Sequence, residues 1–188
     1  MPDPLEIHPL TPERWQDFTA LFGPRGACAG CWCMFPRLSR AEWKRGQGAG
    51  NRRAMERLVR GGTTPGLLAY QDGAPIGWVA ASPREDLVTL ERSRLFPPTG
   101  EAGVWSISCF FVSRSHRGRG VTVELIRAAT RWARARGARV VEGYPVEPAG
   151  DAMPAAFAWN GIGSAFRRAG FRTTARPSRR RSLVRRRA

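Results

Sequence analysis

Two hydrophobic periods follow each other at the start of the chain. Residues 5–10 place apolar and polar side chains in turn, which is the period-two pattern of a short strand. Thr11 can then cap a helix, and Pro12 can occupy its first position. Apolar residues recur at helical spacing from there to Gly23-Pro24, namely Trp15, Phe18, Leu21 and Phe22. The pattern predicts a strand followed by an amphipathic helix.

The next segments predict a loop, a broken helical region and a hairpin. Residues 25–36 lack a regular period and are expected to form a loop. Residues 39–60 have helical spacing on both sides of a glycine-rich break. Two apolar runs, 66–70 and 75–81, then flank Asp72-Gly73. Asp-Gly between apolar runs is a strong hairpin signal, so these runs are expected to pair as antiparallel strands.

The middle of the chain predicts a strand, a helix and a parallel strand. Residues 83–103 form a polar connection, and 104–112 are apolar enough for a strand buried on both faces. An apolar stripe at helical spacing then runs from Val121 to Trp132, and Gly137 suits the end of that helix. Residues 139–146 are predicted to form the second strand of this unit. A strand–helix–strand unit of this kind is expected to be parallel.

The last third predicts a short helix and two strands. The helix is expected over residues 157–168, with Asn160 near its start and Gly170 at its end. Residues 171–175 and 182–186 are expected to be strands, so the arginine-rich tail is interpreted as a strand with solvated arginines. The tail as a disordered segment or as a contact for an anionic partner stays open. No internal repeat or linker is visible, so residues 1–188 are expected to form a single domain.

The most informative local pattern is the turn between strand 104–112 and the following helix. Arg117-Gly118-Arg119-Gly120 lies directly before the helix start at Val121. Glycines let backbone N–H groups approach an anion without a Cβ in the way, and a helix N-terminus adds about half a positive charge. This is a physical recipe for holding phosphate, so we expect a phosphate-bearing cofactor. A tight connection that binds no ligand is the alternative.

Charge favours an anionic small molecule over a nucleic acid. The net charge is +16, but Lys44 is the only lysine and the arginines are spread along the chain. That skew indicates the codon usage of a GC-rich genome more than a binding patch. Hydrophobic content of 42% and charged content of 24% are ordinary for a globular chain. Nucleic-acid binding is therefore kept only as a third hypothesis, tested by its salt dependence.

Targeting signals are not apparent in the sequence. No apolar run approaches the ~18 residues that span a bilayer, so no membrane association is expected. The start, Met1-Pro2-Asp3-Pro4, does not resemble a signal peptide. We therefore expect a cytoplasmic protein with reduced cysteines at four positions, Cys28, Cys31, Cys33 and Cys109.

Three of these cysteines form the most unusual local feature, Cys28-Ala29-Gly30-Cys31-Trp32-Cys33. Cys-x-x-Cys is half of a zinc knuckle, but a closed site needs four ligands and no second pair follows. His8 or Cys109 would have to complete it, so no metal is expected. A zinc site and a regulatory disulfide remain alternatives to a sulfur-rich loop that packs over a cleft.

The order of elements and the glycine turn together resemble the GNAT superfamily of acyl-CoA N-acyltransferases. Its signature is Arg or Gln, two residues, Gly, one residue, then Gly or Ala. Arg117 and Gly120 match, whereas Thr122 replaces the last small residue. Val112 lies five residues before Arg117, as in the family, and Phe166 to Phe171 resembles the family's Tyr-x-x-x-Gly-Phe. The resemblance covers nearly the whole chain after Leu5.

The resemblance implies a fold, a cofactor and a set of contacts. The fold is α/β (α+β), a mixed central sheet of about six to seven strands with helices on both faces. Acetyl-CoA is the implied co-substrate, with a small-molecule or protein amine as acceptor, and a homodimer is left open. Coenzyme A is expected to contact Phe111, Val112, Arg117, Gly118, Arg119, Gly120, Val121, Thr122 and Asn160. The acceptor pocket is expected to include Trp32, Met34 and Phe35.

The catalytic residues are harder to assign. Phe166 stands where the family has the tyrosine that protonates the leaving thiolate, and strand 104–112 carries no acid. Tyr144 is the best substitute acid, and Glu142, two positions earlier on the same strand face, is the candidate base. Both could instead be structural. Cys109 as an acylated nucleophile is the weaker alternative, because no histidine is adjacent in sequence. A non-catalytic acyl-CoA-binding protein is the second hypothesis.

Overall fold

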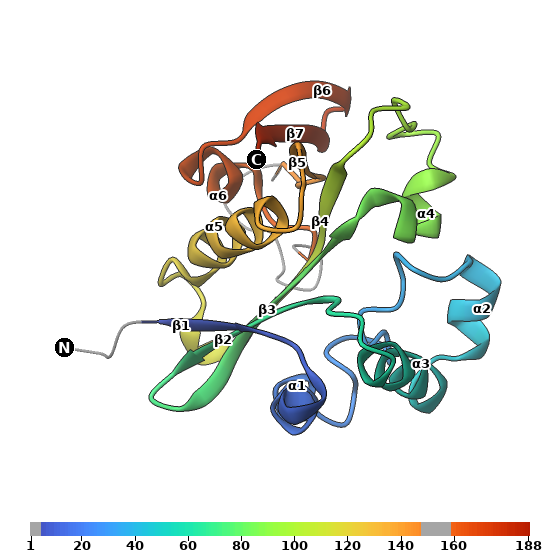
Figure 1. The fold of residues 1–188 in the computed structure, drawn as a ribbon, viewed down its shortest axis with the longest axis vertical. Coiled ribbons are helices and arrows are strands. Elements are labelled where there is room, and N and C mark those ends of the chain that lie inside the picture. Colours follow the sequence, from blue (N-terminus) through green and yellow to red (C-terminus); the bar gives the residue numbers. More distant parts are fainter. Residues whose placement is uncertain (1–4, 148–158) are drawn as a thin grey trace.

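The structure is a computed structural model that describes residues 5–147 and 159–188, built around one seven-stranded sheet (Figure 1). The strand order is β1-β2-β3-β4-β5-β7-β6. The pairing of β4 with β5 is parallel and the other pairings are antiparallel, which confirms a mixed sheet. The strands are β1 (Glu6–Pro9), β2 (Gly66–Gln71), β3 (Ala74–Pro83), β4 (Val104–Val112), β5 (Val140–Gly143), β6 (Arg172–Ser178) and β7 (Arg181–Arg187).

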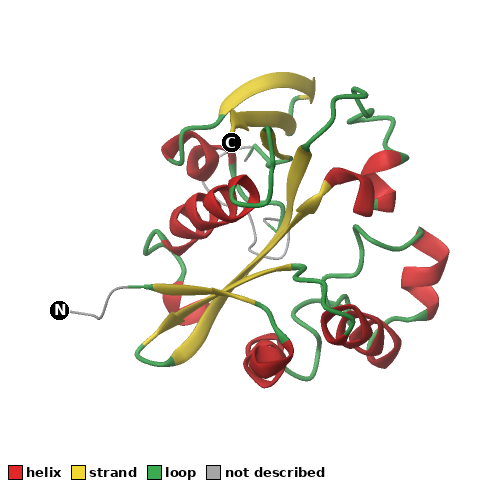
Figure 2. Cartoon of the chain, in the orientation of Figure 1, coloured by secondary structure: helices red, strands yellow, loops and turns green. Residues whose placement is uncertain are grey.

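Within residues 5–147 and 159–188, six α-helices and three short 3₁₀ turns connect the strands (Figure 2). The helices are α1 (Trp15–Phe22), α2 (Arg40–Arg45), α3 (Ala49–Arg60), α4 (Val88–Glu91), α5 (Val121–Arg134) and α6 (Gly163–Arg168). The 3₁₀ turns are η1 (Pro12–Arg14), η2 (Arg84–Asp86) and η3 (Arg114–His116). None of the helices in the described ranges has the length and apolar character that a membrane crossing requires.

Helices cover both faces of the sheet, as the resemblance implied (Figure 1). The alternation of side chains along β2 separates the two cores. Leu67 and Ala69 pack with apolar residues of α5, whereas Leu68 and Tyr70 pack with α1 and α3. The amphipathic stripes of α1 and α5 therefore face opposite sides of the same strands.

Local signals in the sequence explain several boundaries. The Ser39 hydroxyl accepts from the N–H of Glu42, and the Glu42 carboxylate accepts from the N–H of Ser39, so a capping box starts α2. Asp72 and Gly73 both have positive φ, 50° and 72°, which fits the two-residue hairpin predicted between β2 and β3. Thr11 precedes η1 but makes no side-chain cap bond, so that expectation was wrong.

A bulge in β4 opens the centre of the sheet. Cys109 pairs with Ala80 of β3, and Ile107 pairs with Ala81, so Ser108 is an extra residue on β4. On the other side, β5 pairs with β4 only as far as Ile107 and Gly143. The two parallel strands therefore separate beyond this point, and we call the place where they part the fork.

The end of the chain differs from the sequence prediction in two places. The strand expected over 139–146 is shorter and ends at Gly143, because Pro145 interrupts the pairing. Beyond it, Val146 makes two isolated bridges, one to Ile162 and one to Arg181. The late helix begins at Gly163, so Asn160 lies in a turn and does not open it. Phe157, the expected start, lies outside the described residues. The arginine-rich tail is a strand, as expected, and lies between β5 and β6.

Candidate active site

The turn between β4 and α5 presents a row of backbone N–H groups. Gly118 and Gly120 have φ of 75° and 84°, a left-handed geometry that glycine adopts readily. A Cβ at either position would meet no atom within 4 Å, so the turn is open on its outer side. Within the described residues, the N–H groups of 118–122 have no acceptor; the first bonds beyond them run from Val123 and Glu124 to Gly120. Five unpaired donors at a helix N-terminus form an anion-binding geometry.

The two arginines of this turn are held differently. The Nε of Arg117 donates to the carbonyl oxygen of Val112 at 2.9 Å, which fixes its side chain against the end of β4. Arg119 is exposed and has no polar partner among the described side chains. The Nδ1 of His116 lies 2.7 Å from the Ser113 hydroxyl, so this histidine is engaged in the turn itself.

The open edge of β4 is set by its pairing with β3. The N–H of Ser113 donates to the carbonyl oxygen of Ile76 on β3. In an antiparallel pair the backbone groups of successive residues point to alternate sides, so those of Phe111, two residues earlier, also point to β3, where Trp78 is its partner. The sequence prediction that the backbone of Phe111 pairs with a ligand was therefore wrong. The backbone groups of Val112 and Phe110 face the open edge, but the N–H of Phe110 already donates to the carbonyl oxygen of Trp159 at 2.7 Å. The contact of Val112 with coenzyme A remains a prediction.

A first cavity of about 470 Å³ lies beside this edge. It is mainly apolar, and the loop between α1 and α2 forms one wall. Arg117 is the only charged side chain among the described residues that line it. Phe35 lines it, and its contact with an acceptor remains a prediction. Trp32 and Met34 do not line it, because both are buried in the core shared with Phe18 and Trp78, so this part of the acceptor-pocket prediction was wrong. The described residues that line it are Phe22, Ala27, Cys28, Ala29, Cys31, Cys33, Phe35, Pro36, Trp43, Cys109, Phe110, Phe111, Arg117 and Trp159.

All four cysteines line this cavity and all four are free thiols. Among residues 5–147 and 159–188, no group of His, Cys, Asp or Glu is arranged to hold a metal ion. The Nε1 of Trp78 donates to the Sγ of Cys33 at 3.3 Å. A hydrogen bond between Cys33 and Cys109 lowers the pKa of Cys33 and raises that of Cys109. A raised pKa keeps Cys109 a thiol, which disfavours it as a nucleophile.

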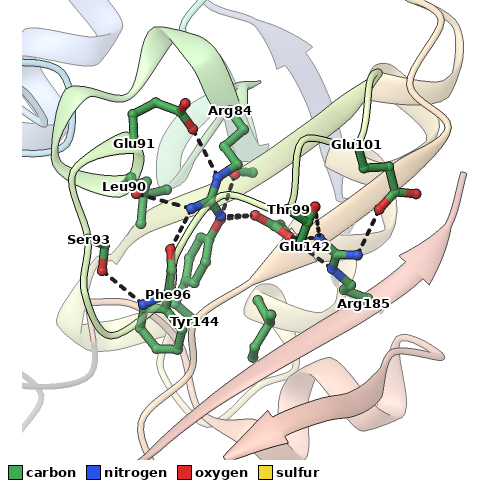
Figure 3. A network of polar contacts seen from close by, with 12 residues as sticks. Arg84, Leu90, Glu91, Ser93, Phe96, Thr99, Glu101, Glu142, Tyr144 and Arg185 are labelled. Atoms are coloured by element: carbon green, nitrogen blue, oxygen red, sulfur yellow. Dashed lines mark hydrogen bonds and ion pairs between the residues drawn. The ribbon is translucent and has the colours of Figure 1, made fainter. Parts of the chain in front are cut away.

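A buried polar network occupies the fork of β4 and β5 (Figure 3). The Tyr144 hydroxyl donates to the Oε1 of Glu142, lies 2.7 Å from the Oγ of Ser106, and accepts from the Nη1 of Arg84 at 3.0 Å. Arg84 also forms an ion pair with Glu142 and another with Glu91, at 3.0 Å for the latter. Glu142 and Tyr144 thus share a site, as their spacing predicted.

Both oxygens of the Glu142 carboxylate are occupied. Arg84 and Tyr144 contact Oε1, while the guanidinium of Arg185 on β7 contacts Oε2 at 2.9 Å and reaches Glu101 at 2.8 Å (Figure 3). The side chain of Glu142 is fully buried. A general base needs a lone pair that faces its substrate, so this arrangement favours a positioning role for Glu142. Its role as base remains a prediction.

The electrostatics keep Tyr144 neutral. Burial raises the pKa of its phenol well above the ordinary range, and the neighbouring Glu142 carboxylate raises it further. Burial opposes the charge on Arg84, but Tyr144 and Glu142 outweigh it and raise the pKa of the guanidinium. Sequence reasoning missed Arg84 and Arg185, because nothing local distinguishes them from the many other arginines.

Asn160 and Phe166 border the fork from the other side. The amide of Asn160 donates to the carbonyl of Ser108 at 3.1 Å and accepts from Arg181 at 3.0 Å. Its contact with coenzyme A therefore remains a prediction, with both amide groups already partnered. Phe166 is fully buried, and its ring packs so closely on Gly143 that a Cβ there would lie 2.4 Å from it.

Comparisons with known proteins agree on one fold. Residues 30–154 match the sequence profile of the Acetyltransferase (GNAT) family. No curated protein sequence is significantly similar to the chain. The PaiA N-acetyltransferase of Thermoplasma acidophilum, solved in complex with coenzyme A, has a TM-score of 0.56 at 12% identity, covering 99% of this chain and 100% of its own.

Two further solved structures are similar to the same extent. The ribosomal-protein-alanine N-acetyltransferase of Brucella melitensis has a TM-score of 0.56 at 18% identity, covering 97% of this chain and 99% of its own. The GNAT domain of S. lividans PAT has a TM-score of 0.54 at 18% identity, covering 98% and 90%. At these identities the likeness establishes the fold alone.

Proposed function

The chain belongs to the acetyltransferase (GNAT) family, and from this premise we propose that it transfers an acetyl group from acetyl-CoA to the primary amine of a small molecule or protein. The observation that carries the proposal is the row of five unpaired N–H groups at 118–122, flanked by Arg117 and Arg119. Backbone donors and a helix N-terminus favour a diphosphate, because its charge is spread over several oxygens.

The cofactor is proposed to run from this turn along the open edge of β4. The diphosphate lies on the N–H groups of Gly118 to Thr122, with Arg117 and Arg119 beside it. The pantetheine arm pairs with the N–H of Val112 and the carbonyl of Phe110, in the manner of an added strand, while the carbonyl of Val112 stays bonded to Arg117. From Val112 to the bulge at Ser108 the strand covers about 13 Å at ~3.3 Å per residue. The first cavity lies beside this part of β4, and its apolar lining packs against the pantetheine arm.

The proposed reaction is direct attack of the amine nitrogen on the thioester carbon. A carbon–nitrogen bond forms, the carbon–sulfur bond breaks, and the thiolate of coenzyme A takes a proton. A free alkyl ammonium has a pKa near ~10, so it must lose a proton first. No carboxylate lines either of the two cavities beside the fork in the described residues, so water carries this proton away. Positioning of the two substrates supplies most of the acceleration.

Tyr144 is proposed as the acid that assists the leaving thiolate, and Glu142 as the residue that positions it. The phenol borders the second cavity and remains protonated at neutral pH. Its raised pKa also makes it a reluctant donor, so the expected assistance is small. If Glu142 acts only through Tyr144, Tyr144→Phe and Glu142→Gln lower kcat by similar factors, and the double variant loses little more. A larger, additive loss with a changed pH profile would assign Glu142 the base role instead.

A non-catalytic acyl-CoA-binding protein is the second candidate. The observation that favours it is Phe166, which has no proton to donate at the family's usual acid position. Both candidates bind coenzyme A, but only the first releases free thiol steadily when acetyl-CoA and an amine are supplied together.

Calorimetry with coenzyme A and a thiol-release assay over a panel of amines test both candidates. Arg117→Gln with Arg119→Gln is expected to weaken coenzyme A binding about tenfold or more, since each removes a charged hydrogen bond. Arg114→Gln is the matched control, because Arg114 is equally exposed and lies outside the glycine turn. Absence of binding heat for coenzyme A would overturn both candidates, and binding without thiol release would leave the second.

A further inference from the structure

A second, smaller cavity lies on the far side of the bulge from the glycine turn. It has a volume of about 230 Å³ and is bordered by Ser108, Tyr144 and the segment that follows α4. Phe35, Pro36 and Trp159 line both cavities, so the two meet near the fork. Sites for drug-sized ligands occupy roughly 300–1,000 Å³, so this one fits a small molecule. On the proposed function, a second substrate in this cavity would approach the acyl group from the side opposite the cofactor.

A cation faces this cavity. Among the described residues of the lining, Arg181, the first residue of β7, is the only charged side chain, and it is partly buried. Its Nη1 donates to Asn160, and its guanidinium carbon lies 5.6 Å from the centre of the Phe96 ring. The Nε is buried and has no hydrogen-bond partner among the described residues. Burial lowers the pKa of this guanidinium, as expected for a charge that has lost water.

Two neighbouring arginines show what Arg181 lacks. Arg84 contacts two carboxylates, Glu91 and Glu142. Arg185, four residues along the same strand, contacts Glu142 and Glu101. No carboxylate within the described residues lies within ion-pair distance of Arg181, although removing a charge from water is unfavourable unless it is paired. An anionic group in the cavity would pair with Arg181 as Glu142 pairs with Arg84 and Arg185.

The rest of the lining restricts the form of that anion. Phe35, Phe96 and Trp159 provide flat apolar walls, and Ser93, Ser108 and the Asn160 amide add neutral polar groups. The rings of Phe96 and Tyr144 lie 5.0 Å apart, and the two side chains can be followed in Figure 3. A single guanidinium matches the single charge of a carboxylate, which it can bind through two parallel hydrogen bonds.

We propose that the acceptor is a small amine that carries a carboxylate, and that Arg181 binds this carboxylate and so determines acceptor specificity. The inference rests on the proposed acetyl transfer. The carboxylate lies against Arg181 and the amine points past Ser108 toward the fork. An amino acid, with its amine a few bonds from its carboxylate, is the chemical class that satisfies this spacing.

The test compares paired acceptors in the thiol-release assay. Glycine, β-alanine and γ-aminobutyrate are each assayed against their amides, which keep the amine and remove the charge. The wild-type protein is expected to favour at least one acid over its amide about tenfold or more in kcat/KM, mainly through KM, as a charge-assisted bidentate contact would give. Arg181→Gln is expected to bring that ratio close to one, and Arg181→Lys to restore part of it.

The control distinguishes an effect of Arg181 in the cavity from an effect of the protein's overall positive charge. Arg179→Gln removes the same charge from an exposed neighbour, and is expected to leave the acid-to-amide ratio at its wild-type value. A preference for the amides, an equal response to both arginine variants, or a preference for phosphoethanolamine over every amino acid would overturn the inference.

Failure of the proposed function has a different signature. If no amine supports thiol release, calorimetry with coenzyme A present still measures whether β-alanine binds better than its amide. Binding that requires Arg181 would support the acid-binding site alone, and equal binding of both ligands would overturn it. Without coenzyme A binding, the proposed function fails whatever the acceptor data show.

Discussion

The glycine turn before α5 and the network at the fork use arginine and hydrogen-bond donors in opposite ways. In the turn, five backbone N–H groups and Arg119 have no acceptor among the described residues. At the fork, Glu142 is fully buried and each of its oxygens is contacted by an arginine. Open donors at a helix N-terminus leave room for an anion, whereas donors and acceptors that satisfy each other inside the protein hold side chains in place. The two regions should therefore respond to substitution in different measurements.

The largest effect is expected from Glu142→Gln, which leaves Arg84 and Arg185 without their shared carboxylate. Removing one partner of a buried ion pair lowers the free energy of unfolding by about 3–5 kcal/mol. Chemical denaturation measures the loss. Glu101→Gln is the control, because it removes an exposed partner of the same Arg185 and should lower stability by less than about 1 kcal/mol. If both variants lose an equal, small free energy of unfolding, the network at the fork does not stabilise the protein more than an exposed ion pair does.

An intermediate effect is expected from alanine at two glycines that bracket α5. Gly120 and Gly137 have φ of 84° and 85°, and a Cβ at either would meet no atom within 4 Å. Both substitutions should therefore lower the free energy of unfolding by a similar ~1–2 kcal/mol, the strain of a left-handed alanine. Only Gly120→Ala is expected to weaken coenzyme A binding as well. If Gly137→Ala weakens binding equally, the turn is not the anion site.

The smallest effect concerns the alkaline titration of the two tyrosines in the chain, Tyr70 and Tyr144. Burial raises the pKa of both, and the Asp17 and Glu142 carboxylates respectively add to the shift. Because each phenol has a higher pKa in the folded than in the unfolded protein, it contributes to the free energy of unfolding. This contribution is fully present below the ordinary pKa of 10.0 and is lost as the pH rises above that value. Phenolate absorbance should therefore appear only as the protein unfolds.

Single phenylalanine variants assign this titration. Tyr144→Phe should halve the phenolate signal and make stability less dependent on pH above the ordinary tyrosine range, because one linked proton is removed. Tyr70→Phe is the matched comparison. A tyrosine that ionises at its ordinary pKa in the folded wild-type protein, and is absent from the Tyr144→Phe variant, would contradict the closed network at the fork.

The same contrast explains what could be predicted from sequence. The turn is local: Arg117 to Gly120 are adjacent in the chain, so residue type and spacing predicted both its geometry and its place before α5. The hairpin at Asp72-Gly73 and the limits of β4 were predictable for the same reason. The register of Glu142 and Tyr144 on one face also followed from the strand period.

The network and the second cavity could not be predicted, because their members meet only in three dimensions. Arg84 follows β3, Glu142 lies on β5 and Arg185 on β7, and no local spacing links them. The burial of Trp32 and Met34 depended on a loop with several left-handed residues, which periodicity does not describe. The pairing of Phe110 with Trp159 depended on how the chain returns to the fork.

The position of β7 has a consequence for how the protein is made. Although β7 follows β6 in the chain, it lies between β5 and β6, and it carries both Arg181 and Arg185. A ribosome must therefore synthesise the chain through Arg187 before β5 gains its second neighbour and Glu142 its second cation. Until then the nascent polypeptide exposes an unpaired strand edge and a half-neutralised carboxylate. A polypeptide that stops before Arg185 would therefore keep this exposed edge, which favours aggregation.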